Sequence, residues 1–209
     1  MSILKPYVIT PIEPLELTEE GQQLQSISLE TIILDQAERE KYTIYIVLTD
    51  TKTIFSRLSR IITQAEYNHI SISLTKNLDT LYTYVLINKN GLKGGLVLED
   101  RKRLKGAKYL LYSITLSKDS YNKFVTTLEE QVANIHTSRY NHLGLINTIF
   151  KKEIFKSYDE TKMICSQFVY RLFERSGIEL IKNQSEFTIR PYDFIKSDLL
   201  KFVGQGRFD

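Results

Sequence analysis

The chain has 209 residues, of which 42% are hydrophobic and 25% charged, as expected for a globular domain with an extension. Its 28 basic and 25 acidic residues leave a net charge of +3, too small an excess to predict nucleic-acid binding. The single cysteine excludes an internal disulfide and a cysteine-based zinc site. No apolar leader and no apolar run of ~20 residues is present, so we expect a cytoplasmic protein without an integral membrane segment.

Residues 1–40 are predicted to be an extension outside the domain, which is expected over residues 41–209. The extension is polar and contains Pro11 and Pro14, and Leu29–Glu40 could form a short helix. It carries no recognisable chemistry. Two roles remain open for it, an arm packed on the domain and a segment that binds a partner.

The first half of the domain is predicted to be rich in strands. The β-branched and aromatic run Tyr42–Leu48 indicates a buried strand, and Thr53–Gln64 has its isoleucines and leucine at helical spacing. His69–Leu74 alternates strictly between polar and apolar residues. A turn over Thr75–Asp79 and a returning strand over Leu81–Ile87 complete a hairpin.

Strict alternation sends the side chains of successive strand residues to opposite faces. Ile70, Ile72 and Leu74 are therefore expected on one face, and His69 with the two serines on the other. The imidazole of His69 is expected on a polar or cleft-facing surface of the sheet. A plain surface histidine is the alternative.

The middle of the chain offers structure but no strong motif. The glycine-containing segment Asn88–Gly95 lacks the spacing of a phosphate loop and is interpreted as a connection bordering a cleft. A short strand over Leu96–Leu98 and a solvated basic cluster over Arg101–Lys105 are expected next. A strand over Ala107–Leu116 follows. Beyond it we expect a helix over Ser120–Ile135, capped by Asp119 or Ser117, and a turn into a short helix over Tyr140–Ile146.

The only cysteine precedes an amphipathic helix. Phe168, Val169, Leu172 and Phe173 recur at the spacing of one buried stripe, and Gly177 marks the end of the helix. Cys165 falls at the first turn, where unpaired N–H groups and the helix dipole favour a thiolate. The hypothesis is a nucleophilic Cys165, and the alternative is a small buried apolar residue.

The order of these segments resembles the circularly permuted branch of the NlpC-type papain-like superfamily, in which a histidine strand precedes a cysteine helix. The matching stretches are Asn68-His69-Ile70-Ser71-Ile72-Ser73-Leu74 and Ile164-Cys165-Ser166-Gln167-Phe168-Val169. Arg190-Pro191-Tyr192-Asp193 and Tyr140-Asn141-His142-Leu143-Gly144-Leu145 are also similar to segments of uncharacterised bacterial members. The resemblance implies an α+β papain-like fold, a mostly antiparallel sheet with the cysteine helix packed against it.

The resemblance also implies a role for each site residue. Cys165 is expected to attack a carbonyl carbon while His69 holds the proton and stabilises the thiolate as an ion pair, which lowers the thiol pKa. Thr83 is chosen as the residue that orients the imidazole, with Tyr82 and Tyr84 as alternatives. Relatives more commonly have His, Glu, Asn or Gln at that place. The other two histidines, His136 and His142, remain competitors to His69.

The activity expected from this resemblance is that of a cysteine hydrolase cleaving an amide bond in a peptide or cell-wall-type fragment. Two alternatives remain open: an acyltransferase or thioesterase acting on lipid or acyl esters, as in lecithin retinol acyltransferase relatives, and a catalytically weak ligand-binding module. The expected partner is a peptide or acyl substrate. Neither a cofactor nor a metal is expected, and the sequence leaves the oligomeric state open.

Overall fold

A computed structural model describes residues 41–51, 66–87, 93–156 and 159–209, and the chain from Arg39 to Asp209 groups as one compact unit. The helices predicted over Leu29–Glu40 and Thr53–Gln64 lie outside the described residues. No helix in the described part of the chain has the length and apolar character to cross a membrane.

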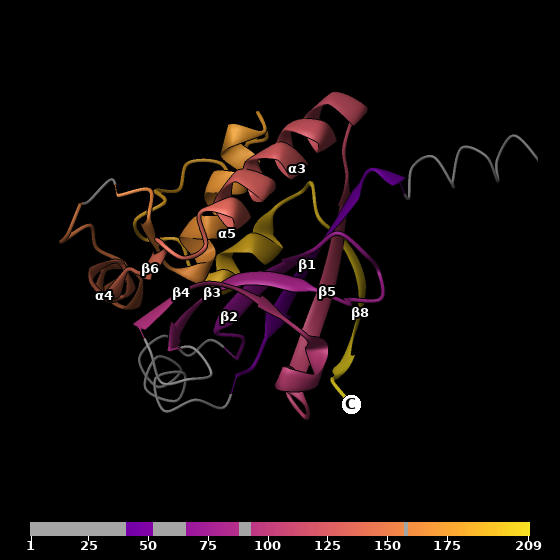
Figure 1. The fold of residues 1–209 in the computed structure, drawn as a ribbon, viewed down its shortest axis with the longest axis horizontal. Coiled ribbons are helices and arrows are strands. Elements are labelled where there is room, and N and C mark those ends of the chain that lie inside the picture. The colour runs from indigo at the N-terminus through magenta and orange to yellow at the C-terminus, as the bar shows by residue number, and fades with distance from the viewer. Residues whose placement is uncertain (1–40, 52–65, 88–92, 157–158) are drawn as a thin grey trace, which may run out of the picture. The chain divides into compact units, whose positions relative to one another are not determined.

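The centre of this unit is a six-stranded sheet in the order β4-β3-β2-β1-β5-β8, in which neighbouring strands are antiparallel (Figure 1). The strands are β1 (Thr43–Thr49), β2 (His69–Ser73), β3 (Leu81–Ile87), β4 (Lys93–Glu99), β5 (Lys108–Thr115) and β8 (Lys201–Arg207). They confirm the strands expected from the patterns over 42–48, 69–74, 81–87 and 107–116. The coarse expectation of an α+β chain with a mostly antiparallel sheet is therefore confirmed.

The central strands β1 and β2 are buried on both faces, so the side of β2 that was expected to be a polar or cleft-facing surface is covered along its serines. Every residue of β1 is buried, and on β2 both Ser71 and Ser73 are as fully buried as Ile70 and Ile72. Alternation correctly separates the two faces, but it does not determine what covers each of them. His69 is half-buried at the start of the strand.

Each face of the sheet has its own apolar core. The isoleucines of β1 and β2 pack with the helices on one face. The second core is smaller and gathers side chains from the opposite face and its connections: Tyr45, Val47, Leu78, Leu81, Leu104, Ala107, Leu111 and Phe208. The basic cluster supplies part of this core, because it forms the short helix η1 (Arg101–Leu104), whose leucine is buried while its three basic residues are exposed.

The expectation of a loop up to Gly95 is wrong at its end, because Gly94 and Gly95 belong to β4. The part of the predicted loop over residues 88–92 lies outside the described residues. A β-carbon on Gly95 would lie 2.6 Å from Ser138 Oγ, and one on Gly94 would lie 1.9 Å from the carbonyl oxygen of Val85. Both glycines therefore permit close approach of neighbouring chain segments, which is a known use of glycine inside a strand.

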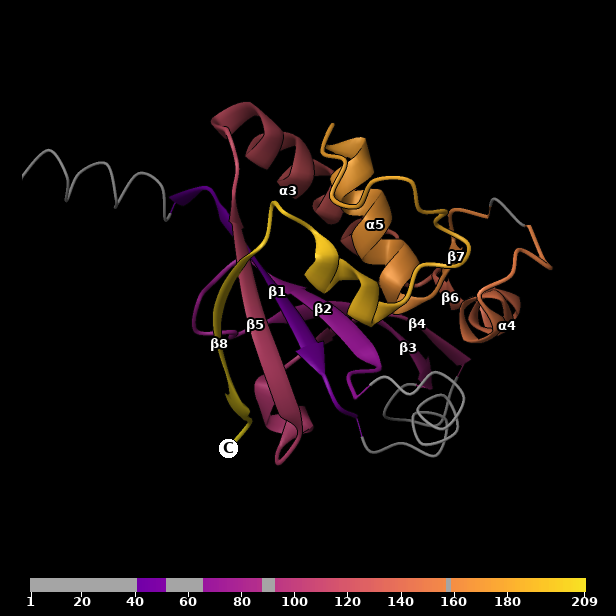
Figure 2. The ribbon, with the colours of Figure 1, turned by 180° about the vertical axis from the view of Figure 1, so that it is seen from behind.

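Two helices cover the face of the first core (Figure 2). Helix α3 (Lys118–Ala133) begins after Ser117, whose hydroxyl accepts a hydrogen bond from the amide of Ser120 at 3.2 Å. Helix α5 (Cys165–Arg175) packs between α3 and the strands β2 and β3. The rings of Phe124 and Phe173 join the two helices, with centroids 4.8 Å apart.

The remaining elements surround the N-terminal end of α5. Strands β6 (Arg139–Tyr140) and β7 (Lys162–Met163) form a small parallel pair. Helix α4 (His142–Phe150) follows β6, as predicted. The segment beginning Arg190-Pro191 forms the 3-10 helix η2 (Pro191–Lys196).

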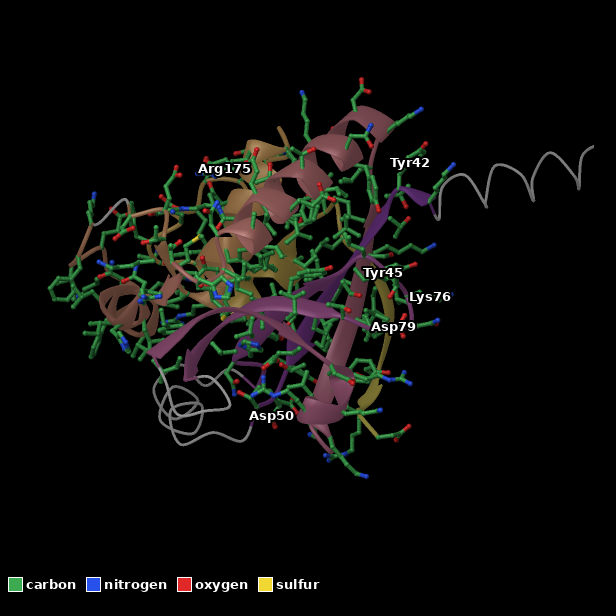
Figure 3. All side chains as sticks on the ribbon, viewed as in Figure 1. Tyr42, Tyr45, Asp50, Lys76, Asp79 and Arg175 are labelled. Atoms are coloured by element: carbon green, nitrogen blue, oxygen red, sulfur yellow. The ribbon has the colours of Figure 1, made fainter. Side chains whose placement is uncertain are left out.

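The β2–β3 connection is the predicted turn. The hydroxyl of Thr75 donates a hydrogen bond to Asp79 at 3.2 Å, and Leu78 adopts the left-handed conformation with φ of 58°. Lys76 and Asp79 are exposed at the edge of the molecule (Figure 3).

Candidate functional site

Helix α5 places Cys165 at its first position, as predicted. The N-cap residue, Ile164, has no polar side chain that could cap the helix. Instead, a side chain of the first turn does so: Gln167 Oε1 accepts a hydrogen bond from the Ile164 amide at 3.2 Å. On the other side of the cysteine, Ser166 donates its hydroxyl proton to the Ile189 carbonyl at 2.7 Å. These two bonds fix the backbone around the sulfur.

The thiol of Cys165 is buried, with 6% of the residue exposed. Burial raises its pKa to about 11, although the backbone N–H groups of Ile70, Ser166 and Cys165 itself act in the opposite direction. The resting thiol is therefore neutral at pH 7. The expectation that the resting thiol has a lowered pKa is wrong, because desolvation outweighs the N–H groups of the helix start.

His69 and Thr83 are joined directly. The distance from Thr83 Oγ1 to His69 Nε2 is 3.2 Å, and the same hydroxyl donates to the Ile70 carbonyl at 2.8 Å. A hydroxyl has one proton to donate, so towards His69 it accepts. The bond therefore favours the tautomer with the proton on Nε2 and leaves Nδ1 with its lone pair. Burial lowers the pKa of His69 to about 4, so the resting imidazole is neutral.

The two alternatives to Thr83 have other surroundings. The ring of Tyr84 packs on Phe168 of α5, with centroids 5.3 Å apart, and Tyr82 packs against the same core. Neighbouring residues of β3 point to opposite faces, so Thr83 is the residue of this strand segment that faces the imidazole.

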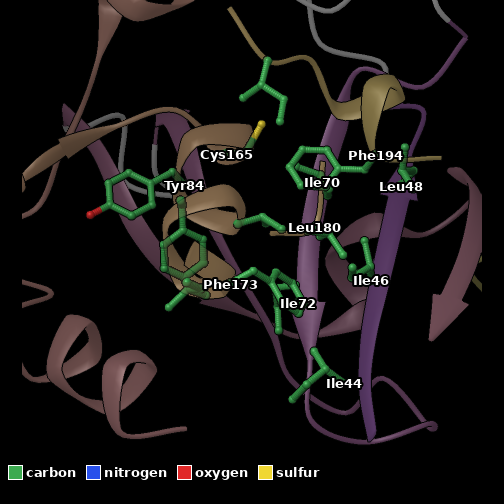
Figure 4. Packing of buried hydrophobic residues seen from close by; sticks show 14 of the residues in the cluster. Ile44, Ile46, Leu48, Ile70, Ile72, Tyr84, Cys165, Phe173, Leu180 and Phe194 are labelled. Carbon is green, nitrogen blue, oxygen red and sulfur yellow. The ribbon is translucent and has the colours of Figure 1, made fainter. Parts of the chain in front are cut away.

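Cys165 lies in the core on the Ile70 face of the sheet, whereas the side chain of His69 leaves β2 on the opposite face. The strand backbone at Ile70 therefore separates the sulfur from the imidazole. The backbone N–H of Ile70 faces the sulfur, and the Ile70 carbonyl accepts from Thr83, which in turn holds His69. Within the described residues, Cys165 and His69 form no hydrogen bond. The structure thus assembles His69 with Thr83 and brings Cys165 against the residue that follows His69. Figure 4 shows Cys165 at the end of α5 nearest Ile70.

The competing histidines are exposed. His136 follows α3, and its carbonyl accepts from the Arg139 side chain at 3.0 Å. His142 opens α4, and its ring lies 5.7 Å from that of Tyr140. Tyr140 lies near the thiol. Burial, and to a smaller extent the negative charge of an ionised Cys165, raise the pKa of the Tyr140 phenol.

Sequence reasoning assigned no role to Asn141 and Gln167, which link α5 to α4. Gln167 Oε1 accepts from Asn141 Nδ2 at 3.3 Å, and Asn141 Oδ1 accepts from the Gly144 amide at 2.8 Å as the cap of α4. Gln167 is 1% exposed, and its Nε2 has no hydrogen-bond partner among the described residues. The sequence signal for the cap of α4 was Asn141 itself, because asparagine is a preferred N-cap residue.

No group of three or more His, Cys, Asp or Glu side chains in the described ranges is placed to hold a metal ion. No known protein family matches the chain, and no curated protein is significantly similar to it.

Among solved structures, the chain is similar to the crystal structure of the metalloprotein yiiX from Escherichia coli O157:H7, which carries the family label DUF1105. The TM-score is 0.55 at 12% sequence identity, over 80% of this chain and 99% of that one. At this identity the likeness concerns the fold alone: the two chains share the arrangement of a sheet with its covering helices.

Proposed function

We propose that this chain is a thiol-dependent hydrolase of the permuted papain-like type, acting on an amide bond in a peptide or cell-wall-type fragment. The observation that carries the proposal is the bridge at Ile70, which joins His69 and Thr83 on one side and meets the thiol on the other. Covalent catalysis requires a nucleophile within reach of an oriented base, and the hydroxyl of Thr83 would supply the orientation of His69.

The chemistry would start from neutral partners. Thr83 holds the Nε2 proton of His69, so Nδ1 is the atom that would take the thiol proton as the sulfur attacks the carbonyl carbon. Because the strand backbone at Ile70 lies between the imidazole and the sulfur, one of the two would have to move around it when substrate binds, the stage at which catalytic contacts tighten. The N–H groups at the start of α5 would bind the oxyanion, and the proton on Nδ1 would pass to the leaving amine. Water would then hydrolyse the acyl-enzyme.

A turnover panel of peptide amides and acyl esters tests this proposal. We expect cleavage of the amides, with Cys165→Ser inactive and His69→Ala reduced by about 10²- to 10⁴-fold. The matched control is His142→Ala, an exposed histidine near the same site, which should retain activity. Equal losses in the two histidine variants would remove His69 from its role, and turnover of esters alone would favour the acyltransferase or thioesterase alternative.

One observation favours a ligand-binding module as a second candidate: burial keeps both the thiol and the imidazole uncharged. In that case no member of the panel turns over, whichever residue is changed. The alkylation rate of Cys165 by iodoacetamide sharpens the distinction. Without substrate it should increase with pH towards about 11 and stay below that of a free thiol. For the hydrolase, a bound peptide aldehyde should form a thiohemiacetal with Cys165, whereas a binding module should form none.

A further inference from the structure

Helix α4 buries its small and polar residues and exposes apolar ones. Its buried residues are Gly144, Asn147 and Thr148. Leu143 is 48% exposed and Phe150 58% exposed. A surface helix normally places its apolar stripe towards the core, so the reversed orientation of α4 calls for a partner outside the domain.

The exposed apolar side chains come from one short stretch of the chain. Leu143 and Phe150 are seven residues apart, so they project from the same face of α4 about two turns apart. Ile154 and Phe155 follow in the next turn of chain and are 54% and 38% exposed. In both ribbon views α4 lies at the rim of the molecule, on the far side of α5 from α3 (Figures 1 and 2). We call the group Leu143, Phe150, Ile154 and Phe155 the α4 surface.

The structure holds these residues in place at the surface. Asn147, which is fully buried, accepts from the amides of Ile154 at 3.0 Å and Phe155 at 2.9 Å, and its own amide donates to the Phe155 carbonyl at 2.6 Å. One side chain thus folds the turn after α4 back onto the helix. The exposure of Ile154 and Phe155 is therefore a property of an ordered turn.

The C-terminal end of α4 is held in the same way. Arg190 donates to the carbonyls of Thr148 and Ile149, both at 2.9 Å. These carbonyls belong to the last turn of a helix, where no intrahelical partner is available. The guanidinium therefore fixes α4 to the segment that also accepts the Ser166 hydroxyl.

Lysines adjoin the apolar group. Lys151, Lys152 and Lys156 are exposed, and the acidic side chains that pair with them among the described residues are Glu153 and Asp193, which leaves a positive excess of one. Lys156 pairs with Glu153 at 2.6 Å, and Lys151 lies 3.7 Å from Asp193. Exposed aromatic and aliphatic residues next to lysines are the composition of segments that lie in a membrane interface.

We propose that the α4 surface docks on an anionic lipid bilayer. Leu143, Phe150, Ile154 and Phe155 would enter the boundary between headgroups and acyl chains, while the lysines meet the negative headgroups. The charge complementarity favours this occupant over a second copy of the chain, whose own α4 surface carries the same lysines. The proposal does not depend on catalysis by Cys165.

Co-sedimentation of the full chain with vesicles tests this docking. We expect binding to phosphatidylcholine vesicles that contain about 30 mol% phosphatidylserine, weaker binding to phosphatidylcholine alone, and a decrease as salt is raised. Phe150→Ser combined with Ile154→Ser should weaken binding at least about tenfold, because two of the inserted side chains become polar. Lys152→Gln, which removes one positive charge, should weaken binding to the anionic vesicles by about fivefold.

The matched control is Leu199→Ser combined with Phe202→Ser, two residues that are 51% and 52% exposed elsewhere on the surface. This pair should bind as the unaltered chain does, and circular dichroism should show all variants folded. Docking is overturned if the unaltered chain stays in the supernatant or if both pairs lose binding equally. It is also overturned if the α4 pair only converts a dimer to a monomer in size-exclusion chromatography.

Discussion

Helices α4 and α5 are neighbours that use their apolar residues in opposite ways. Helix α5 buries Phe168, Val169, Leu172 and Phe173 against the sheet and α3. Helix α4 leaves Leu143 and Phe150 half in solvent and buries an asparagine and a threonine instead. Their N-termini are joined through Gln167 and Asn141. Apolar content therefore does not determine which face of a helix is buried; the position of the helix in the fold does.

The largest expected difference between the two helices comes from one substitution made in each. Phe168→Ala should lower the free energy of unfolding by about 3–5 kcal/mol, because it removes a fully buried ring that packs on Tyr84. Phe150→Ala should change it by no more than about 0.5 kcal/mol. Urea unfolding of both variants measures these two changes in the free energy of unfolding. Similar losses would mean that Phe150 is covered in solution.

The buried site beside α5 should also make stability depend on pH. The pKa of His69 is about 4 in the folded chain and near 6.5 when unfolded. Between these values the unfolded chain binds the proton and the folded chain does not. The free energy of unfolding should therefore fall as the pH drops from about 6.5 to about 4, by up to about 3 kcal/mol. His69→Gln should flatten this part of the pH profile; an unchanged slope would assign it to other groups.

The polar interior of α4 can be tested at Asn147. Asn147→Ala removes three hydrogen bonds to Ile154 and Phe155 and should cost about 2–3 kcal/mol of stability. The amides of residues 154 and 155 should then exchange hydrogen faster. Asn134→Ala, at an exposed asparagine, should cost no more than about 0.5 kcal/mol. Unchanged exchange at 154 and 155 would contradict the anchoring role.

The smallest effect is expected at Thr83. Thr83→Val keeps the shape but removes both hydroxyl bonds, and it should cost about 1 kcal/mol. Its more specific consequence is that His69 loses its preference for the Nε2 proton, which ¹⁵N NMR of the imidazole measures. Thr83→Ser should retain that preference. A tautomer unaffected by Thr83→Val would show that another group orients the ring.

Local signals were sufficient for much of the framework. The alternation of His69–Leu74, the stripe after Cys165 and the cap at Ser117 predicted their elements, because each depends on residues close in sequence. The choice of Thr83 over its tyrosine neighbours also agrees with the hydrogen bond to His69.

Other features depended on contacts between distant segments. Gly94 and Gly95 were expected in a loop, but they belong to a strand because Val85 and Ser138 approach too closely for a β-carbon. The thiol pKa was expected to be low from the helix start, yet burial raises it, and the amount of burial depends on segments far along the chain.

The sequence alone therefore determined the strands β1, β2, β3 and β5, the position of Cys165 at a helix start and the two faces of β2, since side-chain periodicity and capping act over a few residues. Only the tertiary structure decided that both faces of β2 are covered, that Ile70 lies between the thiol and the imidazole, and that α4 turns its apolar side outward. Burial and electrostatics are set by what packs against a group, and those neighbours are brought together from residues 70, 140, 165 and 190 only when the chain folds.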